Sequence, residues 1–210
     1  MSLATVNLTP NWDFEHGDKL FTAAIDEFVT AGYESASINT ILKKAGMSKG
    51  QFYYHFKSKE GLYLALIDVL IAQKQAFMAT VMRPEDFQQD IFTILRTQIQ
   101  HGLAFGRLYP AINRFSASFL REQGNPIYDR AMSIHNFEGN AGMNQLIEMA
   151  YQRGEFRDDL PLPFIKKAIG FLFTHVAEMT DLQDSDHIEQ NLLHFIHFLQ
   201  YGLARPTSQE

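Results

Sequence analysis

The residues of this chain that could do chemistry are concentrated in one short cationic stretch. Between Ser35 and Lys59 the sequence has no Asp or Glu, although the whole chain carries a formal net charge of −6. The cationic and imidazole side chains of this stretch are Lys43, Lys44, Lys49, His55, Lys57 and Lys59. Because Lys side chains neutralise nucleic-acid phosphates, the stretch predicts a DNA-binding surface, with a solvated helical face as the alternative.

Other kinds of chemistry have little support in the sequence. The chain has no Cys, which excludes disulfides, thiolate metal sites and cysteine nucleophiles. His194 and His197 are three residues apart, but no further metal ligand follows at a matching spacing. The sequence also lacks phosphate-binding glycine loops, nucleophile elbows and paired-carboxylate motifs. We therefore expect no enzyme, no catalytic residue, no metal site and no cofactor.

Short helices must position the cationic stretch. Apolar residues at helical spacing over 21–28 predict a first helix at about 18–31, which Gly32 ends. Ser37 is a suitable N-cap for a second helix that continues to Lys44.

The next residues have the spacing of a helix-turn-helix motif. Gly46 ends the second helix, Met47 can fill the turn from inside, and Ser48 can cap a third helix. Ser58 can then cap a fourth helix that closes the module near Gln75.

The third helix would enter the major groove of DNA. Its first turn would meet base edges, and Lys49, Gly50 and Gln51 are cationic, small and polar, as that position requires. Gly50 would let the backbone approach DNA closely, and Gln51 could read adenine through its donor and acceptor. The side chains that could donate to phosphates are Tyr53, Tyr54 and His55.

This region resembles a known family. The segment AGMSKGQFYYHFKSKEGL, with FVTAGYESASINTILKKAG before it, is similar in register to the DNA-binding domain of TetR-family repressors over about 18–75. The resemblance implies DNA contacts from Ser37, Ser48, Lys49, Gly50, Gln51, Tyr53, Tyr54, His55 and Lys59. The sequence departs from the family at Leu42, where alanine is usual, and at Thr40, where an acidic residue is common. Without that acidic residue, Ser37 should lack its usual capping-box partner.

Composition and spacing favour an all-α fold. Hydrophobic residues make up 46% of the 210 residues, and the 18 Phe and 8 Tyr are concentrated in segments with helical spacing. We expect a three-helix helix-turn-helix DNA-binding domain at 15–75, with the motif at 37–56. The fourth helix would link it to a helical ligand-binding and dimerisation domain at 77–205. Neither a signal peptide nor a run of eighteen uncharged apolar residues is present, which predicts a cytoplasmic protein without a membrane partner.

The C-terminal region predicts a homodimer. Its loop RGEFRDDLP is similar to a phrase common in TetR-family C-terminal domains. The helix after this loop carries one apolar stripe from Ile165 to Met179 and another over Phe164, Ala168 and Phe171, and two apolar faces need two partners. The resemblance implies a four-helix dimer interface, with a fully intramolecular core as the alternative. We assign the interface to Ile165, Ile169, Leu172, Val176, Ile188, Leu192, Phe195 and Leu199.

The middle helices predict a ligand pocket. An aromatic and Met-rich stripe is usually plain core, but the resemblance implies a small-molecule pocket, and adaptable Met and aromatic side chains suit one. The candidates are His101, Phe105, Phe115, Phe119, Phe137, Met143, Phe171, His175 and Met179. His101 and His175 are the polar candidates, and each has the alternative of a satisfied or surface histidine.

The leading functional hypothesis is a sequence-specific transcriptional regulator. It would be a repressor that leaves a double-stranded DNA operator, an inverted repeat, when a small hydrophobic or amphipathic effector binds. One alternative is a DNA-binding regulator controlled by a protein partner without a small-molecule effector. The remaining alternative is an enzyme or carrier that uses the aromatic C-terminal pocket.

Overall fold

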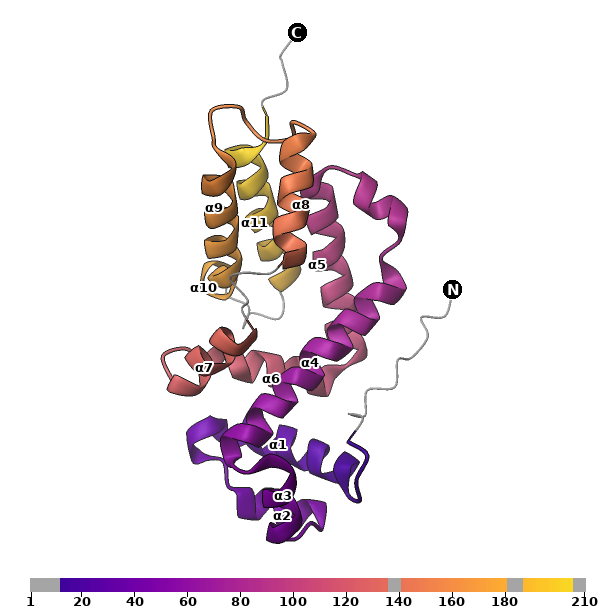
Figure 1. Ribbon diagram of the computed structural model, residues 1–210, viewed down its shortest axis with the longest axis vertical. Coiled ribbons are helices and arrows are strands. Elements are labelled where there is room, and N and C mark those ends of the chain that lie inside the picture. The colour runs from indigo at the N-terminus through magenta and orange to yellow at the C-terminus, as the bar shows by residue number, and fades with distance from the viewer. Residues whose placement is uncertain (1–11, 136–140, 181–186, 206–210) are drawn as a thin grey trace. The chain divides into compact units, whose positions relative to one another are not determined.

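The computed structural model describes residues 12–135, 141–180 and 187–205. Their regular secondary structure is helical, apart from one isolated antiparallel bridge between Phe156 and Ala204 (Figure 1). The helices are α1 (Gly17–Ser35), α2 (Ile38–Ala45), α3 (Lys49–Phe56), α4 (Lys59–Val81), the 3-10 helix η1 (Pro84–Gln88), α5 (Ile91–Leu108), α6 (Pro110–Arg121), α7 (Pro126–His135), α8 (Ala141–Gln152), α9 (Leu162–Thr174), α10 (Val176–Thr180) and α11 (Ile188–Leu203). The predicted all-α fold is confirmed.

Contacts divide the chain into two compact units. Unit one contains residues 1–80 and 105–131, and unit two contains residues 81–104 and 132–210. Unit one thus includes α6 and most of α7 as well as the N-terminal helices. The functional division into a DNA-binding domain at 15–75 and an effector domain at 77–205 stays a prediction.

Unit one is built around apolar faces of α1, α4 and α6. The fully buried ring of Tyr63 on α4 packs edge-on against Phe28 of α1, with 4.8 Å between ring centroids. The ring of Phe115 on α6 also packs edge-on with Tyr63, with 5.4 Å between ring centroids. Within the described residues, α4 is the one helix long and apolar enough to cross a membrane. Its buried side chains are Leu62, Tyr63, Leu66, Ile67, Gln73 and Phe77.

The helix ends follow local signals, with two differences from the prediction. α1 continues to Ser35, but Gly32 interrupts its regular geometry at φ 73° and ψ 169°. α4 extends beyond Gln75 to Val81, because the sequence has neither Gly nor Pro between Gln75 and Pro84.

The break at Gly32 is closed by α6. The backbone N–H of Tyr33 donates a 2.7 Å hydrogen bond to Glu122 Oε1, just after the end of α6. The Ser118 hydroxyl, which is buried on α6, donates to the Phe28 carbonyl of α1 at 3.3 Å. Polar contacts therefore join the helix that leads into the motif to α6.

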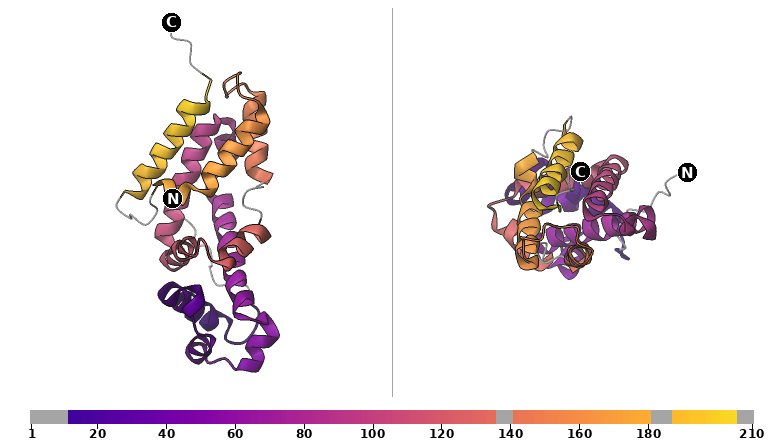
Figure 2. Two further views of the ribbon diagram at one scale, coloured as in Figure 1. Left: turned by 90° about the vertical axis from the view of Figure 1, so that its left-hand side faces the viewer. Right: turned by 90° about the horizontal axis from the view of Figure 1, so that it is seen from above.

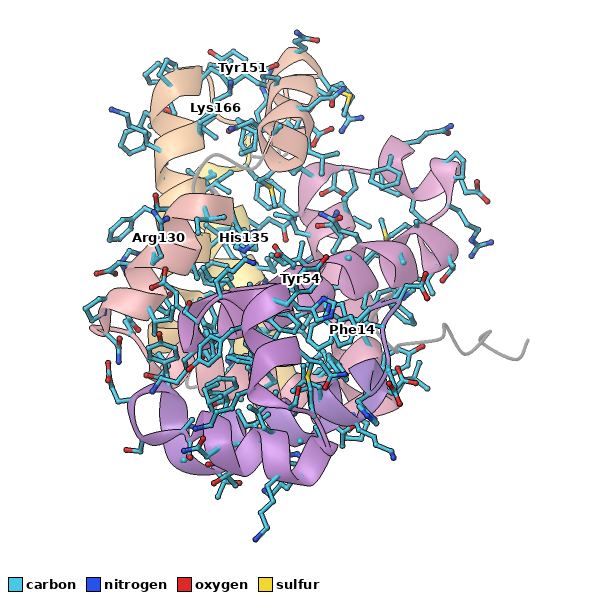
Figure 3. All side chains as sticks on the ribbon, turned by 60° about the horizontal axis from the view of Figure 1, so that its bottom comes forward. Phe14, Tyr54, Arg130, His135, Tyr151 and Lys166 are labelled. Carbon is cyan, nitrogen blue, oxygen red and sulfur yellow. The ribbon has the colours of Figure 1, made fainter. Side chains whose placement is uncertain are left out.

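Unit two is a bundle in which α5, α8, α9 and α11 run side by side (Figures 1 and 2). Lys166 of α9, which is labelled in Figure 3, forms an ion pair with Glu148 of α8. The core of the bundle is formed by Ile91, Phe92, Leu95, Ile147, Ala150, Phe156, Ile165, Ile169, Phe195, Ile196, Leu199 and Leu203.

The RGEFRDDLP loop is fixed to the end of α11. The Arg157 N–H donates to the Leu203 carbonyl at 3.0 Å, and the Arg205 N–H donates to the Glu155 carbonyl at 2.9 Å. Phe156 between them is buried in the core, so this loop is part of the bundle.

Candidate nucleic-acid interface

The N-terminus of α2 is capped by side chains from two helices. Ser37 Oγ accepts the N–H of Thr40 at 3.4 Å, and Glu27 Oε1 on α1 accepts the N–H of Ser37 at 3.1 Å. Glu27 also pairs with Lys44 of α2 at 3.6 Å. Ser37 lacks a capping-box partner at position 40, as expected, and Glu27 of α1 supplies the acceptor in its place.

The N-terminus of α3 has a complete capping box. Ser48 Oγ accepts the N–H of Gln51 at 3.2 Å, and Gln51 Oε1 accepts the N–H of Ser48 at 3.0 Å. The Ser48 hydroxyl also donates to Gln51 Oε1 at 2.9 Å. With its oxygen used by the cap, Gln51 keeps only its amide N–H groups for a base. In this arrangement the oxygen is not free for bidentate reading of adenine, which stays a prediction.

Most of α3 faces solvent. This eight-residue helix buries one side chain, Phe52, and Met47 fills the preceding turn from inside, as predicted. Tyr53 is 51% exposed and Tyr54 is 74% exposed, an unusual exposure for rings of this size. Exposed tyrosines beside a cationic first turn are suited to donate to phosphates.

Gly50 has open space where a side chain would stand. A Cβ built there would meet nothing closer than Ser48 Oγ at 4.0 Å, and the residue is helical. A glycine inside a helix costs about 1 kcal/mol relative to alanine. Packing within the protein does not require a glycine at this position. The close approach of another molecule to the helix backbone would require one.

The cationic side chains around α3 differ in their exposure and in their hydrogen bonds within the protein. Lys43 and Lys49 are exposed, whereas the Lys57 ammonium group donates to the Tyr54 carbonyl at 2.8 Å. Lys59 is half-buried, and its ammonium group donates to the Glu34 carbonyl at 2.8 Å near the end of α1. The Lys59 ammonium group thus already makes a hydrogen bond within the protein. If Lys59 also contacts DNA, as predicted, a phosphate would share this ammonium group with the Glu34 carbonyl.

The C-terminal end of α3 is covered by residues that the sequence analysis missed. The Phe14 ring stacks on the His55 imidazole with 4.0 Å between centroids, and Trp12 lies 4.9 Å from Phe56 (Figure 3 labels Phe14 and Tyr54). The sequence signal for these contacts is the presence of two aromatic residues just before the first amphipathic helix. Because imidazole nitrogens lie in the ring plane, face stacking leaves them able to donate to a phosphate.

The predicted pocket residues do not gather at one site within either unit. Phe105, Phe115 and Phe119 are buried in the core of unit one, and Phe171 and Met179 are 62% and 50% exposed in unit two. None of these five side chains lines the recess described below, and their assignment to a pocket stays a prediction. Phe137 lies outside the described residues.

The polar candidates do not line the recess of unit two either. His175 stacks on Phe171, and its Nδ1 lies 2.8 Å from the Phe171 carbonyl, the arrangement of a satisfied histidine. His101 does not line the recess, whereas Met143 does. This recess in unit two, of about 400 Å³, is lined by Phe87, Gln98, Gly142, Met143, Gln145, Leu146 and Met149.

Half of the predicted dimer interface is internal. Ile165, Ile169, Phe195 and Leu199 belong to the core of unit two. Their assignment to an intermolecular face was wrong, because that stripe packs within one chain. The residues Leu172, Val176, Ile188 and Leu192 are partly exposed.

A second set of large aromatic side chains on α9 and α11 faces solvent. On α9 Phe164 is 53% exposed and Phe171 is 62% exposed, and on α11 Phe198 is 61% exposed and Tyr201 is 79% exposed. Large aromatic rings at this exposure on neighbouring helices mark an interaction surface.

Comparisons with known proteins bear on the N-terminal region first. The family described as "Bacterial regulatory proteins, tetR family" matches residues 20–66. The HTH-type transcriptional regulator QacR of Staphylococcus aureus is 38% identical over 52 residues, which are 25% of this chain and 28% of that protein. The HTH-type transcriptional regulator RutR of Escherichia coli K12 is 31% identical over 99 residues, which are 45% and 43% of the two chains. The chain thus spans less than half the length of these curated relatives.

Solved structures match nearly the whole chain. A TetR family transcriptional regulator from Chloroflexus aurantiacus is 25% identical, with a TM-score of 0.66 over 93% of this chain and 96% of that one. A putative TetR family regulator from Shewanella sp. PV-4 is 18% identical, with a TM-score of 0.64 over 92% and 100% of the two chains, and shares the fold. With the capped helix-turn-helix at 37–56, these matches show a DNA-binding domain of the TetR family of bacterial transcriptional regulators at the N-terminus, in a chain with the fold of TetR-family regulators.

Proposed function

We propose that this chain is a sequence-specific DNA-binding repressor that acts as a homodimer and is released from its operator by a small effector. The observation that carries the proposal is the first turn of α3, where Lys49, Gly50 and Gln51 are all exposed. The protein's own packing uses none of these positions except the Gln51 oxygen in the cap. A turn with a cation, an open glycine and an amide donor is suited to the major groove.

Different residues of this surface would bind phosphates and recognise bases. Lys49 would neutralise a phosphate, and the exposed hydroxyls of Tyr53 and Tyr54 would donate to neighbouring phosphates and fix the register. Gly50 would let the helix backbone approach the groove, and the Gln51 amide N–H groups would donate to a base acceptor.

A second copy of the chain would supply the second reading helix. The formal net charge of −6 opposes binding to phosphates, so one motif alone should hold DNA weakly. The exposed aromatic side chains of Phe164 and Phe171 on α9, and of Phe198 and Tyr201 on α11, support pairing of these helices with the same helices of another copy. A two-fold dimer would bind an inverted repeat.

Control by an effector fits the recess in unit two. Met143 and Met149 give it an adaptable apolar lining, and the amides of Gln98 and Gln145 offer donors and acceptors. These side chains suit a small hydrophobic or amphipathic molecule. A coupling of about 1–3 kcal/mol between this molecule and the operator would change DNA affinity by about 5–150-fold.

A selection experiment tests the DNA-binding part. The full chain is incubated with random DNA duplexes, and bound duplexes are amplified and sequenced over several rounds. We expect an inverted repeat whose half-site centres are about one helical turn apart or a multiple of it. Enrichment of no sequence would refute sequence-specific binding.

Effector control is tested separately on the complex with the selected duplex. Small hydrophobic compounds are screened first for a raised melting temperature of the free protein. Stabilising compounds should then weaken binding to the duplex. Compounds that stabilise the protein without changing DNA affinity would favour control by a protein partner.

A further inference from the structure

The segment immediately before α1 folds back on itself and forms an aromatic hook, which we define as Trp12 and Phe14. The Phe14 N–H donates to the Trp12 carbonyl at 2.8 Å, and the Gly17 N–H donates to the Phe14 carbonyl at 3.1 Å. His16 between them has a positive φ of 71°. These bonds make a tight turn in front of α1.

Gly17 allows this turn to close. A Cβ at Gly17 would lie 2.7 Å from the Trp12 carbonyl oxygen and 3.2 Å from Trp12 Cβ, and the first distance is too short for two atoms that do not bond. The backbone of Trp12 therefore occupies the space of a side chain at Gly17. A glycine here is required by a close approach within the protein, unlike Gly50.

The two rings of the hook cover the end of the recognition helix. Trp12 packs edge-on against Phe56 at 4.9 Å and against Phe21 of α1 at 5.9 Å. Phe14 stacks on His55 at 4.0 Å and lies 6.0 Å from Phe56. The hook thus joins the beginning of α1 to the last turn of α3, which are far apart in the sequence.

α3 has few other means of keeping its orientation. It is eight residues long, contains Gly50 and buries only Phe52. Helices shorter than about 12–15 residues are marginal without tertiary packing. The capping box holds the N-terminal end, and the residue after the helix, Lys57, has a strained positive φ of 65°. Beyond Phe52, the aromatic contacts on His55 and Phe56 pack the C-terminal end of α3 against the segment before α1.

We infer that Trp12 and Phe14 are positioning residues that fix the recognition helix for DNA binding. The inference rests on the proposed function, because orientation of α3 matters only if this helix reads DNA. Reading depends on the geometry of several simultaneous contacts, so a tilted α3 would lose the selected sequence while keeping its charge. Loss of two aromatic pairs corresponds to about a tenfold change in an equilibrium constant.

Hydrogen exchange tests the hook without DNA. In the full-length Trp12→Ala variant, we expect the α3 amides to exchange faster than in the unaltered chain, while amides of α6 keep their rates. Gly17→Ala should have the same effect, because it opens the turn without removing a ring. Trp12→Phe should restore slow exchange. Equal acceleration in every helix of unit one would overturn the inference, since it would mean loss of general stability.

Binding to the selected duplex provides the second readout. We expect Trp12→Ala to weaken binding about tenfold, Trp12→Phe to restore most of the affinity, and binding to a scrambled duplex to stay unchanged. Phe119→Leu is the matched control, because Phe119 is a buried ring that packs on Tyr128. Unchanged α3 exchange together with unchanged affinity would overturn the inference. If the unaltered chain selects no sequence, the proposed function fails and the exchange rates alone decide whether the hook orients α3.

Discussion

Ser48 and Gln51 satisfy each other at the start of the recognition helix. Gln51 Oε1 accepts both the N–H and the hydroxyl of Ser48, at 3.0 Å and 2.9 Å, and Ser48 Oγ accepts the N–H of Gln51 at 3.2 Å. A residue that sequence reasoning assigned wholly to DNA therefore also builds the helix that presents it. Its amide nitrogen remains available for reading.

Substitutions at Gln51 should separate these two roles. Gln51→Glu keeps the capping oxygen and removes the amide donor, so the free energy of unfolding should stay near that of the unaltered chain while operator affinity falls. Gln51→Ala removes both, and it should also lower the free energy of unfolding by about 1 kcal/mol. Base preference should relax at one position in each half-site. Chemical unfolding and repeated sequence selection measure these changes, and an unaltered selected motif in both variants would contradict the assignment.

Gly50→Ala should change stability and DNA affinity in opposite directions. The open space at position 50 and the helical backbone predict a gain of about 0.8–1 kcal/mol in the free energy of unfolding. The added methyl group would meet the DNA backbone or bases, so affinity for the operator should fall about tenfold or more.

Gly102→Ala is the matched control for that substitution. Gly102 lies inside α5, with nothing within 4 Å of a built Cβ. It should give a similar gain in stability and no change in affinity. Tighter DNA binding by Gly50→Ala would show that this turn does not approach DNA.

Lys49→Ala should reduce the salt dependence of operator binding. Removal of one phosphate contact should weaken binding to all duplexes and lower the slope of log affinity against log salt by about 1. Arg83→Ala removes an exposed cation from unit two and should leave the slope unchanged. Fluorescence anisotropy at several salt concentrations gives both slopes, and equal slopes for Lys49→Ala and the unaltered chain would exclude a phosphate contact by Lys49.

A charge on the outer face of α9 should separate the dimer. Phe171→Glu places a carboxylate on an aromatic side chain that is 62% exposed, so each chain should stay folded while self-association is lost. Sedimentation velocity distinguishes the two states. Tyr151→Glu, on α8, is the control and should stay dimeric.

Ile169→Ala should instead destabilise the fold by about 2–5 kcal/mol, because Ile169 is core.

Asp90 should stabilise the start of α5 in a pH-dependent way. Partial burial raises the pKa of this carboxyl, but hydrogen bonds from the Thr93 hydroxyl and from the Thr93 and Phe92 N–H groups outweigh burial and lower it. A lowered folded-state pKa gives stabilisation that is complete above the unfolded-state pKa of about 3.9 and is lost as the pH falls through the folded-state value.

Urea unfolding at two pH values checks this expectation. Asp90→Ala should lower the free energy of unfolding by about 1 kcal/mol at pH 7, and the difference from the unaltered chain should shrink near pH 3. Asp26→Ala, an exposed change on α1, serves as the control. A difference that does not vary with pH would show that the Asp90 charge is not involved.

Features fixed by neighbouring residues could be predicted from the sequence. Ser37 and Ser48 cap α2 and α3, Gly46 adopts the left-handed conformation between them, and Met47 is buried, all as expected from their local spacing. Such positions depend on hydrogen bonds and turns that span only a few residues.

Features fixed by distant contacts could not be predicted in the same way. Glu27 reaches Ser37 from another helix, and Trp12 reaches Phe56 across most of the motif. On α9 both stripes are apolar, so periodicity alone does not tell which of Ile169 and Phe171 faces the core. Ile169 is the residue that packs against α5, α8 and α11 in the core. Phe171 therefore lies on the surface.

The most direct test of the account is a titration of the selected duplex with the full chain. The account predicts that two chains bind each inverted repeat, and that this duplex is bound about 10³-fold or more tightly than a scrambled duplex of equal length at physiological salt. Both affinities should fall as salt rises. Equal affinity for the two duplexes would contradict the claim that α3 reads a DNA sequence.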